Sequence, residues 1–274
     1  MKIQLFFFIM RVLLLGCINI VFCNDKSFVF ITASYNNKEW YQRNLDSAFN
    51  QTYDNWRMIY INDNSTDGTG DLVEEYIRNN QLEDKIQLIN NKVRRGHLAN
   101  QYYAIHSCNK KEIIVILDGD DWLAHNDVLY YLNDVYQDLN VWLTYGQFWY
   151  FKKNVKGFCR PIPAKVIQDN AIREHCEWYY SHLRSFYAGL FQSIKREDLF
   201  YKGNFFPMAA DVATMYPMLE MCGGRFVCIP DVLYIYNDSN QLSFHHDQGD
   251  KQKEIRYDIC HNRRRYTSLK KQPY

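Results

Sequence analysis

Apolar runs typical of buried strands alternate with segments of helical periodicity from residue 27 to residue 151. This alternation predicts βαβ units around a mostly parallel sheet, and a hydrophobic content of 47% agrees with a globular domain. We therefore predict an α/β fold, a single domain with a Rossmann-like sheet flanked by helices. Strands are expected at 27–34, 56–63, 85–90, 112–118, 141–151 and 225–237, and helices at 38–51, 65–80, 97–108, 125–139 and 209–224. Pro217 is expected to kink or shorten the last helix, and Pro230 to interrupt the last strand.

The first 24 residues differ in composition from the rest of the chain. The segment "MKIQLFFFIMRVLLLGCINIVFC" is apolar with few polar residues, which is typical of a signal peptide or a membrane anchor. Lys2 and Arg11 precede its longest apolar run, which favours a translocated domain in the secretory pathway. The sequon Asn64-Ser65-Thr66 lies within the expected ligand site, where a glycan would block binding, and this favours the cytoplasmic face of a membrane.

Three regions follow from this composition. Residues 1–24 are the signal peptide or anchor, residues 25–248 form the α/β domain, and residues 249–274 are a polar, basic tail with a surface helix and a frayed end. The net charge of +1 provides no general attraction for nucleic acid or an anionic membrane, so we expect no nucleic-acid partner. Eight cysteines include no CxxC pair, which argues against a structural zinc site and leaves disulfide formation open.

Polar residues follow three of the predicted strands at the point where each strand ends. They occur in "TASYN" (32–36), "INDNSTD" (61–67) and "LDGDD" (117–121). Because the carboxyl ends of parallel strands meet at one edge of a sheet, these segments should form one ligand site. The chain has neither the GxGxxG fingerprint nor a P-loop, so glycine-rich cradles for phosphate are missing from its sequence.

Asp118, Asp120 and Asp121 provide a different means of binding a diphosphate. Clustered carboxylates supply the hard oxygen ligands that Mg²⁺ or Mn²⁺ prefers, and without a cation they would repel one another. The alternative is an acidic turn that caps the following helix. The five apolar residues before Asp118, together with the other two polar strand ends, favour the ligand site.

Five motifs in order resemble the glycosyltransferases of family 2, which have the GT-A fold. The motifs are "ITASYNN", "YINDNSTDGT", "LDGDDW", "MAADVATMYPMLEMCG" and "IPDVLYIYN", and the resemblance covers about residues 27 to 245. The chain departs from the family pattern at supporting positions, where Asn62 replaces Asp, Asn64 replaces Gly and Ala210 replaces Glu. The resemblance implies transfer of a sugar, with inversion, from a nucleoside diphosphate donor, commonly a UDP-sugar, to an acceptor hydroxyl. It leaves the acceptor open among glycans, lipid-linked compounds and proteins.

The resemblance also implies roles for individual residues. Asp211 would be the general base, and Asp120, with Asp121, would bind Mn²⁺ or Mg²⁺. The residues implied to hold the nucleotide are Thr32, Tyr35 and Asp63 at the base and Asp118 at the ribose.

Two further candidates come from the charge pattern. Arg95 in "NKVRRGHLANQ" would lie near the base or the diphosphate, although a solvated loop explains it equally well. His245 in "LSFHHDQ" would add a metal ligand, although paired surface histidines are at least as common.

Two other functions fit parts of the same pattern. A non-catalytic relative that binds nucleotide sugars would need Asp120 but not Asp211. A nucleotidyltransferase would need a glycine-rich basic loop after the first strand, and "TASYNNKEW" contains no glycine.

Overall fold

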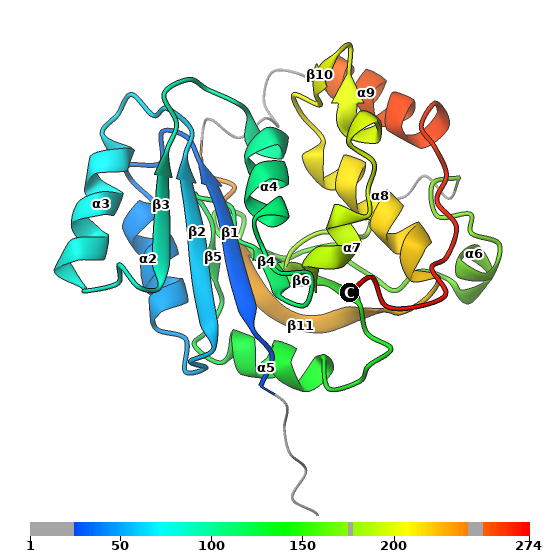
Figure 1. Cartoon of the computed structure of the whole chain (residues 1–274), viewed down its shortest axis with the longest axis horizontal. Coiled ribbons are helices and arrows are strands. Elements are labelled where there is room, and N and C mark those ends of the chain that lie inside the picture. The colour runs from blue at the N-terminus through cyan, green and yellow to red at the C-terminus, as the bar shows by residue number, and fades with distance from the viewer. Residues whose placement is uncertain (1–24, 175–177, 241–248) are drawn as a thin grey trace, which may run out of the picture.

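A central sheet with helices on both faces forms the body of the protein in the computed structural model, which describes residues 25–174, 178–240 and 249–274 (Figure 1). The strands of this sheet are β1 (Phe28–Ser34), β2 (Trp56–Asn62), β3 (Ile86–Asn90), β4 (Ile113–Ile116), β5 (Trp122–Leu123), β6 (Leu143–Tyr150), β7 (Val155–Lys156), β8 (Arg184–Tyr187) and β11 (Phe226–Tyr236). A separate hairpin consists of β9 (Phe200–Tyr201) and β10 (Asn204–Phe205).

The helices are connected to the sheet largely as the sequence predicts. They are α2 (Tyr41–Phe49), α3 (Thr69–Asn79), α4 (His97–His106), α5 (Val128–Val135), α6 (Ala164–Gln168), α7 (Ala188–Gln192), α8 (Ala210–Cys222) and α9 (Gly249–His261), with a 3₁₀ turn at Arg196–Leu199. None of the helices in the described ranges is both long enough and apolar enough to span a bilayer. The predicted N-terminal segment, residues 1–24, lies outside the described residues.

The sheet is mostly parallel, with the strand order β3-β2-β1-β4-β8-β6-β11-β5 and β7 paired to β6. Strands β1 to β4 are parallel, and β6 and β11 run in the same direction as they do. The predicted α/β architecture is therefore confirmed. The order of the first four strands reverses between β1 and β4, and such a switch point is where open α/β sheets bind ligands.

The two prolines have different effects on their elements. Strand β11 continues past Pro230, but its register with β6 shifts between Ile229 and Val232. The predicted interruption is thus a bulge, where a residue without an N–H is tolerated. Helix α8 continues past Pro217 to Cys222, so the expected shortening is wrong.

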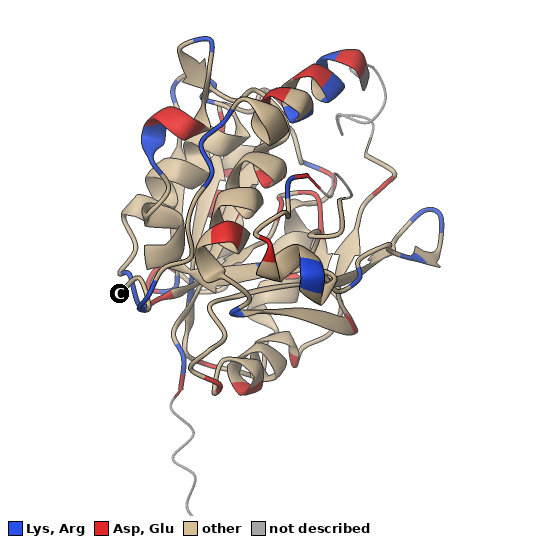
Figure 2. Ribbon diagram, turned by 90° about the vertical axis from the view of Figure 1, so that its right-hand side faces the viewer, with Lys and Arg blue, Asp and Glu red and all other residues tan. Residues whose placement is uncertain are grey.

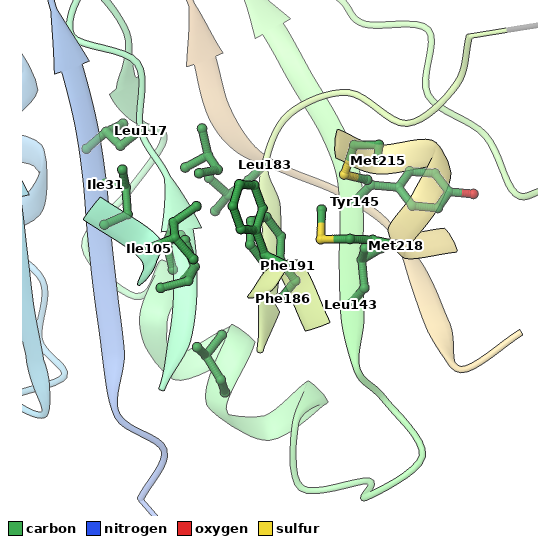
Figure 3. Close-up of a cluster of buried hydrophobic side chains, with 14 of the residues drawn as sticks. Ile31, Ile105, Leu117, Leu143, Tyr145, Leu183, Phe186, Phe191, Met215 and Met218 are labelled. Carbon is green, nitrogen blue, oxygen red and sulfur yellow. The ribbon is translucent and has the colours of Figure 1, made fainter. Parts of the chain in front are cut away.

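One part of the hydrophobic core lies between the sheet and the layer that contains α4, α7 and α8. Figure 3 shows the apolar side chains of this layer in one continuous cluster, from Ile31 and Ile105 to Met215 and Met218. All four residues of β4 are buried, which explains their uninterrupted apolar sequence.

The C-terminal segment is part of this core, so the expected frayed end is wrong. Ile255 and Ile259 of α9 and the ring of Tyr266 are buried. The N–H of Leu269 donates to the carbonyl of Met221 over 2.9 Å. The segment therefore covers α8, the helix that carries Asp211.

A buried ion pair joins α8 to the segment before β8. The guanidinium of Arg173 lies 2.8 Å from Oε1 of Glu220, and the side chains of both residues are almost fully buried. Glu220 Oε2 also accepts a hydrogen bond from the N–H of Tyr266 at 3.0 Å. Burial raises the pKa of Glu220, whereas Arg173 lowers it.

We expect Arg173→Met to lower the free energy of unfolding by about 3–5 kcal/mol, because it removes the closest cation from the buried carboxylate of Glu220 and leaves only Arg265, at 3.4 Å. The double variant Arg173→Met, Glu220→Met should lose less stability, since neither charge remains. Urea unfolding at unchanged m-value measures both changes. Strictly additive losses from the two single variants would contradict this account of the pair.

Candidate active site

The polar ends of β1, β2 and β4 meet at one edge of the sheet, as predicted. In the parallel ladder Ser34 is paired with Asn62, and the N–H of Asp63 donates to the Ser34 carbonyl at 2.8 Å. Strand β4 pairs with the other side of β1, and Asp118 follows it after one further residue, Leu117. In Figure 1 the arrowheads of β1, β2 and β3 point to the side where α8 begins.

The loop after β4 is held in place by backbone contacts and by one buried asparagine. Asn44 Nδ2 donates to the carbonyls of Asp118 at 2.9 Å and Asp121 at 2.8 Å. A Cβ on Gly119 would lie 2.7 Å from the Cβ of Ser34, so only glycine fits against β1 here. These contacts fix the backbone from which the three carboxylates project.

Asp121 is a buried acceptor that connects this loop to β11. Its carboxylate accepts hydrogen bonds from Tyr234 Oη at 2.7 Å and from the N–H of Asn237 at 2.6 Å. Burial, together with the charges of Asp120 and Asp118, raises the pKa of Asp121 well above its ordinary value. Asp121, predicted as a metal ligand, therefore also has a structural role.

Asp118 faces a histidine and an arginine. His97 Nε2 lies 3.5 Å from Oδ1, and Arg184 Nη2 lies 3.4 Å from Oδ2. Burial opposes the charge of Asp118, but His97, Arg184 and His182 lower its pKa below the ordinary value. Asp118 is thus the carboxylate in this loop that is best stabilised as an anion.

His182 completes a set of three residues that could hold a metal ion. Asp118, Asp121 and His182 each offer one ligand atom, and these atoms lie within 4.8 Å of one another. The His182 ring stacks on Tyr234 with a centroid distance of 4.5 Å, which fixes its orientation.

The third carboxylate of the loop, Asp120, has a separate partner. It accepts a hydrogen bond from Asn240 Nδ2 at 2.7 Å. Burial and the charge of Asp118 raise its pKa. His245, the other predicted metal ligand, lies outside the described residues.

His182 and Arg184 were not predicted because their strand was not predicted. Strand β8 is antiparallel and lies between β4 and β6, with Arg184 opposite Ile116. An antiparallel strand brings its amino end to the edge where parallel strands end. The signal available in the sequence was the polar "SHLR" before the apolar "SFYAGLF", in a region without clear periodicity.

The predicted nucleotide side of the site contains two arginines stacked on tyrosines. The Arg94 guanidinium lies 3.7 Å from the Tyr35 ring centroid, and that of Arg95 lies 5.7 Å from the Tyr103 ring centroid. Tyr35 is partly exposed and can contact a ligand. Thr32 is fully buried in β1, so it lies beneath the surface on which a base would rest.

Asp63 organises the loop that carries these arginines. Its Oδ1 accepts from the N–H of Arg95 and its Oδ2 from the N–H of Gly96, both at 2.9 Å. Asn91 Nδ2 donates to Oδ1 at 2.8 Å. Burial opposes the charge, but the hydrogen bonds, with that from Arg95 foremost, lower the pKa of Asp63.

Asp211 lies in the first turn of α8, and its Oδ1 accepts from the N–H of Val212 at 2.9 Å. It is only partly buried. Ala209, just before the helix, has a left-handed backbone with φ of 56°. A non-glycine residue in this conformation is strained, and such strain is often found at functional sites.

We expect Asp63→Asn to lower the free energy of unfolding by about 1–3 kcal/mol at neutral pH, because an amide cannot accept all three hydrogen bonds. The depressed pKa means that the carboxylate stabilises the fold above its ordinary pKa of about 4 and that this contribution is lost as pH falls below that value. The difference in the free energy of unfolding between the wild type and the variant should therefore become smaller below a pH of about 4. Urea unfolding over a pH series measures it, and a constant difference would contradict the assignment.

Comparison with known proteins identifies a family for this arrangement. The family described as "Glycosyl transferase family 2" matches residues 29–201. Glycosyltransferase GlyG of Streptococcus pneumoniae is 24% identical over 215 residues, covering 74% of this chain and 67% of GlyG. Other curated bacterial relatives match over less than two fifths of their own length, for example 34% and 26%.

Two solved structures have a similar fold. TarS of S. aureus in complex with UDP-GlcNAc superposes with a TM-score of 0.62 at 16% identity, covering 85% of this chain and 65% of that one. The mannosyltransferase PcManGT of Pyrobaculum calidifontis, in complex with GDP-Man and Mn²⁺, has a TM-score of 0.53 at 20% identity, covering 81% and 60%. Because the family match extends over more than half of the chain, the protein belongs to family 2 of the glycosyltransferases.

Proposed function

We propose that this protein is a metal-dependent, inverting glycosyltransferase that moves a sugar from a UDP-sugar to an acceptor hydroxyl. The convergence of Asp118, Asp121 and His182 at the carboxyl end of β4 carries the proposal, since it supplies a cation site where a diphosphate would be needed. TarS in complex with UDP-GlcNAc supports a uridine nucleotide as the donor.

The donor set suits a divalent cation. Two carboxylates and an imidazole provide oxygen and nitrogen ligands, which Mn²⁺ accepts more readily than Mg²⁺. PcManGT, whose structure contains Mn²⁺, supports the same choice. When bound, such a cation would supply a Lewis acid for the departing diphosphate.

The side chains around this site have distinct roles in the proposal. Tyr35 and Arg94 form a stacked pair that offers a flat cationic surface for the nucleotide. Asp118 is held as an anion by His97 and Arg184, and a ribose hydroxyl could donate to it. Arg95 is the exposed cation next to this surface.

Asp211 is the proposed general base. Its partial exposure at the start of α8 leaves the carboxylate accessible to an acceptor hydroxyl. Inversion needs one base on the face of the sugar opposite the leaving group, and no covalent intermediate is formed. The acceptor proton therefore moves to Asp211 as the hydroxyl oxygen bonds to the anomeric carbon and the bond to the diphosphate breaks.

We also propose attachment to a membrane through residues 1–24, in the secretory pathway or on a cytoplasmic face. The apolar composition of this segment supports the proposal.

Release of UDP from a panel of UDP-sugars, with Mn²⁺ and with EDTA, tests the activity. One sugar should give metal-dependent release. Asp211→Asn should lower the rate by about 10²–10⁴, the usual contribution of a general base, without loss of UDP binding. His182→Ala should lower both release and Mn²⁺-dependent UDP binding, because it removes one ligand of the proposed cation site. Asp120→Asn should lower both as well, because it removes a negative charge next to Asp118.

Asp71→Asn is the matched control, because Asp71 is an exposed aspartate in the first turn of α3 and should tolerate the change. A non-catalytic relative would be favoured if the wild type binds UDP with metal but releases no UDP with any sugar donor or acceptor, and if Asp211→Asn leaves that binding intact. Failure to bind UDP with any metal would exclude the proposed donor.

A further inference from the structure

A hairpin at the end of β6 exposes apolar side chains to solvent. Residues 151–158, "FKKNVKGF", include Phe151, Val155 and Phe158, whose exposed fractions are 39%, 48% and 47%. Isolated apolar side chains are common on protein surfaces, but three exposed ones within eight residues of a projecting hairpin indicate a binding surface.

The same hairpin carries three exposed lysines and no acidic residue. They are Lys152, Lys153 and Lys156, and no ion pair engages them within the described part of the chain. In Figure 2 the hairpin projects from the right-hand side of the molecule with basic residues at its tip. Asp238 is next to it, but its carboxylate accepts from the backbone N–H groups of Lys152 and Lys153. Lys156 Nζ donates to the Pro230 carbonyl at 3.0 Å, and Lys153 Nζ lies 4.6 Å from the Tyr150 ring centroid. All three lysines are nevertheless exposed, so an anionic partner can reach their ammonium groups.

The shape of the hairpin is fixed before any partner binds. The N–H of Phe151 donates to the Tyr236 carbonyl at 2.9 Å, and the N–H of Gly157 donates to the Phe148 carbonyl at 2.7 Å. Trp149 Nε1 donates to Asn154 Oδ1 at 3.1 Å across the turn. A preformed surface loses little conformational entropy on binding.

We propose that this hairpin docks on an anionic lipid bilayer. Its apolar side chains would enter the interface between headgroups and acyl chains, while the lysines would contact lipid phosphates. The net charge of +1 provides no attraction by the molecule as a whole, so the attraction is local to this hairpin.

The hairpin is joined to the candidate site by aromatic packing. The Phe151 ring contacts Trp122, with 4.9 Å between centroids, and Trp122 follows Asp121 directly. The Arg43 guanidinium lies 3.8 Å from the Trp122 ring centroid on the same cluster. Docking would therefore hold the carboxyl edge of the sheet beside the bilayer, whatever reaction the site performs.

Quenching of tryptophan fluorescence by brominated lipids tests this proposal on the full chain. Val155→Trp places a reporter in the hairpin. As a control, Leu139→Trp places a reporter at an exposed apolar position just before the start of β6, away from the hairpin. Quenching above that of the unsubstituted chain should occur at position 155 in vesicles of phosphatidylcholine with phosphatidylglycerol. It should be weaker in pure phosphatidylcholine and at high salt.

Adding Lys152→Gln and Lys153→Gln to the reporter chain should raise the lipid concentration for half-maximal quenching about 25-fold, because each lysine near an anionic surface contributes roughly fivefold. Both lysines are exposed, and an unchanged Tm will show that the fold is kept. Quenching at position 139 in place of 155 would overturn the proposal, since the N-terminal segment alone would then orient the protein. Quenching at 155 that is indifferent to lipid charge and to the lysines would also overturn it.

Discussion

The architecture of the site depends on the hydrogen bonds that the buried carboxylate of Asp121 accepts. This carboxylate accepts hydrogen bonds from Tyr234 and from the backbone of Asn237, and so joins the loop after β4 to the end of β11. With Asn44 and Gly119 it fixes the backbone from which Asp118 and Asp120 project. If Asp121 lost these donors while it stayed buried, the free energy of unfolding would fall by about 1–3 kcal/mol. The loop after β4 and the end of β11 are therefore held together as one unit.

Much of the fold and part of the site follow from the sequence. The uninterrupted apolar run of β4, buried on both faces, predicts a parallel sheet and places Asp118 at its edge. Parallel pairing then brings Ser34 and Asn62 to the same edge through the register of β1 and β2. These features depend on local periodicity and on the geometry of parallel strands, which a single sequence contains.

The remaining features depend on contacts between segments that are distant in sequence. His182 reaches the site because β8 enters the sheet antiparallel, and nothing in residues 166–200 indicates which neighbour that strand pairs with. Thr32 has the right position for a ligand contact but is covered in the folded chain. The basic tail lacks an obvious apolar pattern, yet Tyr266 is buried and its N–H donates a hydrogen bond to Glu220, a residue distant in sequence.

Anomalous scattering from crystals grown with UDP and Mn²⁺ would test the central claim most directly. The account predicts one manganese peak at the carboxyl end of β4, within bonding distance of the Asp118–Asp121 loop, with UDP extending toward Tyr35 and Arg94. A strong UDP density elsewhere, or a manganese peak away from that loop, would contradict it.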